Sequence, residues 1–535
     1  MRRGTIAAII ALGLAGVGIS QGQATRPATS RPTTMGIVIG RDTTYVTGPL
    51  RPDGTVDYIA AVNAEFSQGV TPQNNAACLL VRVNPPEDSR YEDTPLNKQM
   101  ELTRLLGLQG NVPEQIAWHN LKEFDPKQVG TGYIYQTSKY WAAMAGPWSV
   151  ADMPALQQWL DANKPSLDLA VEASHRERYW MPLVCDSDTE FLLSVERTNG
   201  SRWRALADSL RVRAMQELQQ GNRDATWSDL CAVHRIAGFL AHSPDYLDAA
   251  ISATIQVSAW VSDRALLCDA NVSTDLLHRM ASDMAAFARA PDIREVSGKV
   301  RRLEYLSAVE ETARTWDNAM ATLPPDQRQQ MQNMLNVLGL WQPDWNRMLR
   351  LGNDYWDDVL LDDSAMPADQ QKAHRDELAQ RQQNLSNVVY PPDSPVQDDP
   401  GKSGVWLIPK KNETRDTYSD RLGSYLLAIT VPNIGHFRDR PDRLGNVELD
   451  WTEVAVNLLL YRREHGSYPA QLQDLVPQYM SHLPANVPDY PMRYERQADG
   501  CVLERAPATA TAPLRAATRP TTNPDMNGDF FFRLP

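Results

Sequence analysis

The spacing of apolar residues between residue 203 and about residue 388 constrains the fold of this chain more than any other feature. Gly221-Asn222 ends the first helix of this region, and Asp224, Pro244-Asp245 and Ser273 are expected to open the next three. Short turns between amphipathic helices make neighbouring helices antiparallel, so the sequence predicts a helical bundle or hairpin stack. The first helix has apolar side chains at helical spacing: Trp203, Leu206, Ala207, Leu210, Ala214 and Leu218.

The fold class expected for the whole chain is therefore mainly α. An irregular α-rich domain is expected at 43–195, because short helical patterns there alternate with Pro and Gly turns. One helix is expected from Asp57 to Phe66, and Thr71-Pro72 is expected to open another that ends near Val83.

A helical domain follows at 196–388 and a Pro-rich linker at 389–423. The last part, 424–535, is expected to form a small α+β module: a helix whose start is marked by the acid pair Asp450 and Glu453, then strands at 492–496, 501–505 and 529–534, with a disordered insert at 506–522.

The N-terminus has the order of a secretory signal peptide. Arg2 and Arg3 precede an apolar run from Ile6 to Ile19, and Gly22-Gln23-Ala24 follows as a small-residue cleavage region. The run is shorter than the roughly 20 residues that a spanning helix needs. We expect residues 1–24 to be removed after Ala24, residues 25–42 to form a flexible leader, and the chain to be exported to the periplasm or the extracellular space without stable membrane insertion. An uncleaved anchor is the alternative.

The net charge narrows the range of partners. The whole chain has a formal charge of −13, and residues 1–24 contain two arginines and no acid, so the chain without them has a charge of −15. An acidic surface repels phosphate, which argues against nucleic acid as a partner. A protein or a component of the cell envelope is the partner class that remains.

The cysteines do not define a set of disulfide bonds. Five cysteines are an odd number, so at least one is expected to lack an intramolecular partner. Cys231 and Cys268 lie on helices that could be neighbours, but the sequence leaves every pairing open. The set consists of Cys78, Cys185, Cys231, Cys268 and Cys501.

The C-terminal region resembles the pseudopilins of type II secretion systems. Leu426 to Ile434 is similar to the end of a pilin N-terminal helix, and Tyr461-Arg-Arg-Glu-His-Gly-Ser-Tyr-Pro469 is similar to the helix-to-loop segment that follows it. The resemblance covers roughly 424–535 and implies a pilin-like helix-plus-sheet module. Whether such a module joins a secretion assembly stays open, because no prepilin cleavage site precedes it.

The whole chain also resembles a group of uncharacterised exported proteins of planctomycete bacteria. That resemblance implies export and no particular activity. The segments that carry it are Tyr45-Val-Thr-Gly-Pro49, Val56-Asp57-Tyr58, Gly69-Val-Thr-Pro72, Asn74-Asn75-Ala76, Arg178-Tyr179, Pro182-Leu183, the stretch from Trp227 to Ala237, and the C-terminal module.

The common catalytic motifs are absent from the sequence. It contains no H-E-x-x-H, no paired C-x-x-C, no G-x-S-x-G and no P-loop. His234 and His242 are eight residues apart, two helical turns, which is too far to share a metal ion, so His234 is expected to be a core or interface histidine. No catalytic residue is assigned.

The densest acidic cluster lies between Asp354 and Asp363. In a helix Asp354, Asp358 and Asp362 would form a carboxylate stripe beside Tyr355 and Trp356. Such a stripe could perform glycoside hydrolysis or bind sugars or a cation. The alternative is a solvated acidic face opposite an apolar row that consists of Leu349, Leu351, Tyr355 and Val359.

One segment near the C-terminus has part of a calcium-loop pattern. Asn523, Asp525, Asn527 and Asp529 alternate, and Gly528 allows the sharp turn. Position twelve is Leu534 instead of a bidentate glutamate. The alternatives are a weak calcium site, the only cofactor considered, and an ordinary turn before the last strand.

Taken together, these features favour an exported, non-catalytic scaffold or binding protein. The alternative is a hydrolase of an extracellular glycan that uses the acids near Asp354 to Asp363. Carboxylates gathered in a cleft would favour the enzyme, and carboxylates spread over a convex helix face would favour the scaffold.

Overall fold

The computed structural model divides into two compact units, each assembled from separate stretches of sequence. Unit 1 takes Met1–Gln68, Pro182–Glu196 and Arg294–Asp439; unit 2 takes Gly69–Met181, Arg197–Ile293 and Arg440–Pro535. The described residues are mainly helical, with one small sheet. The structure describes residues 35–83, 96–108, 114–126, 138–185, 192–195, 199–321, 329, 333, 342–362, 366–389, 413–430, 441–484, 492–497, 500–505 and 531–534.

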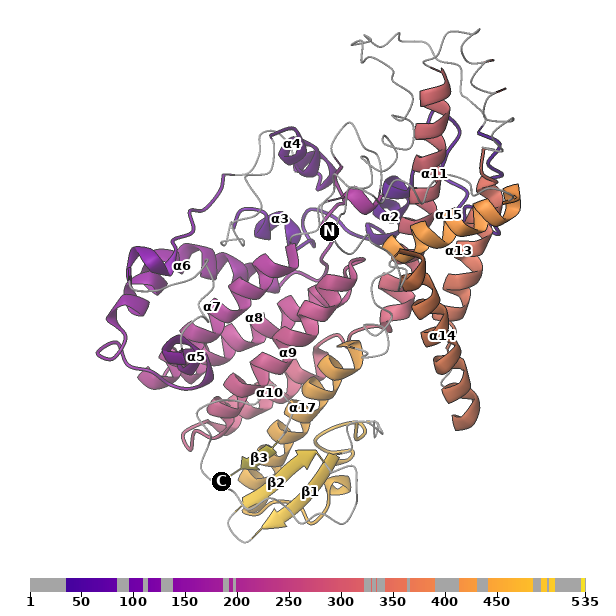
Figure 1. Cartoon of the computed structure of the whole chain (residues 1–535). Helices are drawn as coiled ribbons and strands as arrows, with labels where there is room; N and C mark the ends of the chain where they lie inside the picture. The colour runs from indigo at the N-terminus through magenta and orange to yellow at the C-terminus, as the bar shows by residue number, and fades with distance from the viewer. Residues whose placement is uncertain are drawn as a thin grey trace. The chain divides into compact units, whose positions relative to one another are not determined.

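Three long helices form the body of unit 2. They are α7 (Asn199–Gln220), α8 (Arg223–Ala241) and α9 (Tyr246–Leu267), and they pack side by side in chain order (Figure 1). Gly221 has a φ of +84°, a left-handed conformation that suits glycine at the end of α7. The side chains of Asp245 and Ser273 accept hydrogen bonds from the first turns of α9 and α10, at 3.0 and 3.1 Å. The expected helical hairpins and these two caps are therefore confirmed.

The remaining elements of unit 2 surround this body. Most of the buried apolar side chains of its helices and sheet belong to one continuous hydrophobic core, while Ala77, Cys78 and Leu106 form one smaller cluster and Val447 and Trp451 another. These elements are α3 (Ala77–Leu80), α4 (Leu96–Leu105), η1 (Leu121–Glu123), α5 (Ser138–Ala145), α6 (Pro154–Ser174), α10 (Thr274–Ala286), α17 (Pro441–His465) and η7 (Leu472–Leu475).

The sheet has three antiparallel strands in the order β1-β2-β3. β1 (Met492–Gln497) pairs with β2 (Gly500–Arg505), and β2 pairs with β3 (Phe531–Leu534), with Cys501 opposite Leu534. Cys501, Leu503 and Leu534 are buried in the same core as α17, so the sheet buries one face. The three expected strands are thus present, and the described bounds agree with the predicted ones to within two residues.

Helix α11 (Lys299–Ala321) is the centre of unit 1. It packs against α2 (Tyr58–Phe66), α13 (Trp345–Val359), α15 (Arg415–Thr430) and the short helices η3 (Leu192–Ser194) and η4 (Arg294–Gly298), while α14 (Ala368–Val389) packs on α15 (Figure 1). Asp57 caps α2 by accepting a hydrogen bond from Ala60 at 2.9 Å. The helix expected from Asp57 to Phe66 is therefore confirmed.

The leader expected at 25–42 lies only partly within the described residues. Residues 1–34, which include the expected signal peptide, lie outside them. From Met35 onward the chain packs on α13: the side-chain amide of Asn346 donates to the carbonyl of Gly36 at 2.7 Å and accepts from the amide of Val38 at 2.8 Å. No local sequence pattern indicates this packing, because these bonds come from a helix distant in sequence.

The linker expected at 389–423 overlaps a described helix. Residues 390–412 lie outside the described residues, but α15 begins at Arg415 and buries Tyr418, Ser419 and Leu422 in unit 1. Because α15 belongs to unit 1 and α17 to unit 2, the region 424–535 contributes to both units. The consecutive domains expected from the sequence stay a prediction. The two compact units of the structure have different boundaries from those domains.

Three helix starts differ from the expectation. Asn222 is the residue before α8, and Asp224 lies inside its first turn. α17 begins at Pro441, so Asp450 and Glu453 lie within the helix, where both bind Arg289 and do not mark its start. The helix expected to run from Thr71-Pro72 to Val83 is only the short α3, because side-chain bonds between Thr71 and Asn74 form a turn first.

Candidate functional site

The acidic face predicted near Asp354 is solvent-facing. α13 ends at Val359, so Asp362 lies beyond the helix and the expected stripe has only two helical members, Asp354 and Asp358. Asp354 and Asp357 are exposed, and Asp358 is half-buried. On the opposite side of the helix Leu349, Tyr355 and Val359 are buried, as the apolar row predicted; Leu351 is only partly buried.

Each of three acids on this face is bound by an arginine from a different element. The Asp357 carboxylate lies 2.5 Å from the Arg302 guanidinium of α11, and Asp358 pairs with Arg381 of α14. A third pair joins Asp362 to Arg294 of η4 at 3.1 Å. Asp363 lies outside the described residues. Each of these three described carboxylates therefore has an arginine partner of its own.

The aromatic residues of the cluster are part of the core. Trp356 is 0% exposed and Tyr355 is 2% exposed, and the Arg381 guanidinium lies over the Tyr355 ring at 5.4 Å. A sugar ring needs an open aromatic face to stack on. Neither residue offers one, so the carboxylates stand on the surface without the aromatic platform that the sequence suggested.

A group of buried ionisable side chains lies inside the helical core of unit 2, around His234. This side chain is buried on α8, where Nδ1 lies 2.7 Å from Oε1 of Gln256 and Nε2 lies 3.0 Å from Oδ2 of Asp263. The amide nitrogen of Gln256 is directed at the His234 carbonyl. With the amide in this orientation both ring nitrogens face oxygen acceptors, which favours the doubly protonated imidazolium.

The charge of Asp263 supports that protonation state. Burial alone would lower the pKa of His234, but the attraction of Asp263 and the hydrogen bonds to Asp263 and Gln256 outweigh it and raise the pKa. His242 faces elsewhere, and its Nδ1 lies 2.8 Å from the Gly238 carbonyl. The expectation of a core histidine is confirmed.

Glu448 of α17 is a second buried carboxyl next to this pair. It is 1% exposed, and neither carboxylate oxygen has a hydrogen-bond partner among the described residues. Burial raises its pKa well above the usual value, and the negative charge of Asp263 raises it further. Oδ1 of Asp263 is likewise without a described partner. His234, Asp263 and Glu448, here called the core triad, join helices α8, α9 and α17.

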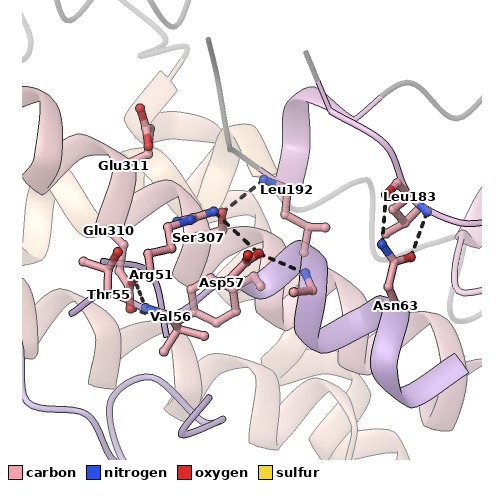
Figure 2. Close-up of polar contacts among 12 residues, drawn as sticks. Arg51, Thr55, Val56, Asp57, Asn63, Leu183, Leu192, Ser307, Glu310 and Glu311 are labelled. Carbon is pink, nitrogen blue, oxygen red and sulfur yellow. Dashed lines mark hydrogen bonds and ion pairs between the residues drawn. The ribbon is translucent and has the colours of Figure 1, made fainter. Parts of the chain in front are cut away.

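Unit 1 has a comparable buried carboxyl, Glu310 on α11. It meets the turn before α2, where Oε2 accepts from the amide of Val56 at 3.0 Å (Figure 2). Its other oxygen, Oε1, accepts from the Tyr58 hydroxyl at 3.1 Å. Burial raises the pKa of Glu310 to about 7, although these two bonds and the charges of Arg51 and Arg314 lower it. The sequence analysis missed Glu310 and Glu448, because an acid in a helical pattern is normally a solvated residue and no local signal marks the exceptions.

The buried thiols form neither disulfides nor reactive nucleophiles. Cys78, Cys231 and Cys501 are free and buried, so no disulfide joins Cys231 to Cys268. Burial raises the pKa of Cys231 and of Cys501 to about 12. Both therefore stay protonated near neutral pH, and a thiol is a poor nucleophile compared with a thiolate.

No metal-binding arrangement is present in the part of the chain that the structure describes. Groups of three or more His, Cys, Asp or Glu side chains with suitable geometry do not occur there. The proposed calcium ligands Asn523, Asp525, Asn527 and Asp529 lie outside the described residues. Among the described helices, none combines the length and the apolar character that crossing a membrane requires.

Comparison with known proteins gives no relative. No family model, no curated protein and no solved structure matches this chain.

Proposed function

We propose that this chain is an exported scaffold or binding protein and not an enzyme. The observation that carries the proposal is the acidic surface along the end of α13 and just beyond it, where Asp357, Asp358 and Asp362 are each bound by a separate arginine. Glycoside hydrolysis needs two carboxyl groups at a fixed separation across one bond. Two carboxyls whose pKa is raised, Glu310 and Glu448, are instead buried where a polymer cannot reach them.

The proposal is tested by a hydrolysis assay with an Asp354→Asn control. Purified chain is incubated with carboxymethylcellulose, xylan and peptidoglycan, and new reducing ends are measured. We expect no turnover by either protein, together with saturable co-sedimentation with the envelope fraction of the producing cells. Turnover that Asp354→Asn or Asp358→Asn abolishes would establish the hydrolase instead.

The proposal includes export of the chain and a relationship to exported planctomycete proteins. The order of basic, apolar and small residues in 1–24 and the segments similar to exported planctomycete proteins support secretion. The helix α17 followed by a small antiparallel sheet is in keeping with a pseudopilin-like module. N-terminal sequencing of the protein from its own cell should find Thr25 first; retained Met1 on membrane-bound protein would exclude cleavage.

A weak calcium site is proposed separately for the loop from Asn523 to Asp529. Alternating oxygen side chains with a glycine at position six support it, and the missing glutamate at position twelve implies a dissociation constant on the order of 10⁻⁴ to 10⁻³ M. The full chain should melt at a higher temperature with ~10 mM calcium than with chelator. Asp525→Ala should abolish the difference and Asp376→Ala, on exposed α14, should keep it; an unchanged wild-type melting temperature would reject the site.

A further inference from the structure

Glu310 is the buried polar link between α11 and the segment that leads into α2. Its side chain is inaccessible to solvent, and its two oxygens accept hydrogen bonds from Val56 (Figure 2) and from Tyr58. Both donors belong to a stretch of only a few residues. The carboxyl group therefore holds that stretch at two points from a single position on the helix.

Arg314, one turn further along α11, holds the same segment from the solvent side. Its guanidinium donates to Asp53 and to the Thr55 hydroxyl, each at 2.8 Å. Arg314 also pairs with Glu311 of its own helix. Residues 53–58 are thus docked on two successive turns of α11, through a buried carboxyl and a half-exposed arginine.

The charges around Glu310 come from a small set of groups. From the N-terminal segment Tyr58 and Arg51 face it, and Arg51 lies 4.0 Å from Asp57; from α11 itself Arg314 acts on it. The other helices that pack on α11 direct their charges elsewhere. Asp357 of α13 pairs with Arg302, Asp420 of α15 with Arg347, and η3 contributes the Leu192 amide, which bonds to Ser307.

A carboxyl group at this position adds a property that an amide would lack. Glutamine could accept the Val56 hydrogen bond with its amide oxygen and donate an amide N–H to the Tyr58 hydroxyl oxygen, and it would carry no charge into the core. With glutamate, the stability of the docked state depends on pH, because the ionised carboxylate must lose its hydration when the segment covers it. The docked segment therefore prefers the protonated acid, whereas a released, solvated Glu310 ionises like an ordinary glutamate.

We propose that Glu310 is a proton-operated latch that holds residues 53–58 on α11 when it is protonated and lets them go more readily once its proton leaves. The pKa of Glu310 is raised from 4.5 to about 7 in the docked state. A raised pKa gives stability that is complete below the undocked pKa and is lost as the pH rises through the docked one. The latch weakens between about pH 4.5 and 7 and stays weak above that range.

Hydrogen exchange of the full chain tests the latch. Peptides covering residues 51–66 are followed by mass spectrometry from pH 5 to 8.5, with correction for the intrinsic exchange rate. In the wild type, protection of this segment should fall by up to about tenfold per pH unit until pH ~7 and then level off. Glu310→Gln should keep its protection constant over the whole range.

The matched control is the neighbouring acid on the same helix. Glu311→Gln changes a group that contacts only Arg314 near the surface and should reproduce the wild-type fall in protection. Should Glu310→Gln fail to fold, Tyr58→Phe serves in its place: it removes a hydrogen bond that favours the ionised acid, so the fall should extend to higher pH. A pH-independent wild type, a fall that persists in Glu310→Gln, or an unshifted fall in Tyr58→Phe overturns the latch.

Discussion

At the scale of single residues, the carboxyl of Glu448 is the group least suited to its surroundings. It is enclosed by unit 2, finds no described hydrogen-bond partner and lies close enough to Asp263 to feel its charge. The charges of the core triad balance when His234 is positively charged beside Asp263 and Glu448 is neutral. Ionising Glu448 would leave a buried negative charge without a counterion, which is costly.

Replacing Glu448 by glutamine should therefore help the protein at alkaline pH. The folded-state pKa of Glu448 is raised above its unfolded value, so the wild type loses stability as the pH rises toward the folded pKa, and glutamine does not. Urea denaturation midpoints of Glu448→Gln should equal those of the wild type near pH 5 and exceed them increasingly up to pH 9. Glu172→Gln, an exposed change on α6 of the same unit, should follow the wild type throughout. A constant gap at every pH would show that the carboxyl does not titrate as expected.

His234 could be predicted from the sequence, and its partners could not. It lies on the apolar face of a strongly periodic helix, which predicts burial. Asp263 and Glu448 lie in equally periodic helices, where an acid normally predicts the solvated face. Their burial results from contacts among three helices that come from distant parts of the chain. The local pattern of one helix contains no information about those contacts.

At the scale of secondary-structure elements, a glycine sets how closely α13 approaches α11. A methyl group added to Gly352 would overlap the Tyr305 ring, which is itself fixed by a hydrogen bond of 2.7 Å from its hydroxyl to the Met348 carbonyl. Gly352→Ala should destabilise the protein by about 1–3 kcal/mol, because a packed aromatic ring cannot move aside without strain.

The control for Gly352 is a glycine inside another helix. Gly238 of α8 has open space where a Cβ would lie, its nearest neighbour being the Ala288 carbonyl at 4.0 Å. Gly238→Ala should stabilise the protein by roughly 0.5–1 kcal/mol, since alanine loses less backbone entropy in a helix. Chemical denaturation of both variants measures the contrast, and equal effects in the two would refute the close approach of α11 and α13.

A second element-scale prediction concerns α17. Leu458 is completely buried in the core that α17 shares with α9 and α10, so Leu458→Ala should cost about 2–5 kcal/mol. Leu247→Ala, at a side chain on α9 that is 49% exposed, should change the free energy of unfolding by less than about 0.5 kcal/mol. A small effect at Leu458 in a urea titration would mean that α17 is not part of the helical core.

The helices of this chain were predictable to the extent that local chemistry defines them. Asp57, Asp245 and Ser273 accept hydrogen bonds at the helix starts where the sequence placed them. The start of α17 was missed because Asp450 and Glu453 look like first-turn acids, whereas in the fold they bind Arg289 from within the helix. An acid pair therefore marks a helix start only where it is not bound by an arginine from a distant part of the chain.

At the scale of the whole molecule, the order of the segments along the sequence differs from their grouping in the two compact units. Composition shifts suggest consecutive domains with a linker at 389–423, while the contacts assemble each unit from three separated stretches. The chain passes between the units several times, so the part after residue 412 supplies α15 to unit 1 and α17 with the sheet to unit 2. A sequence pattern detects the Pro-rich break and cannot tell whether the segments on its two sides remain packed together.

Limited proteolysis distinguishes these two descriptions. Pro391-Pro392 and Asp398-Asp399-Pro400-Gly401 predict that a protease cuts first in this stretch or at 506–522, where the sequence has no apolar period. Because α15 buries Tyr418 and Leu422 in unit 1 and α17 buries Leu458 in unit 2, a cut between α14 and α15 should release nothing. The two fragments should co-elute in native gel filtration and separate only in concentrated urea. A C-terminal fragment that elutes alone and folded would support an independent module, and early cleavage within 225–270 would contradict the packed helical body.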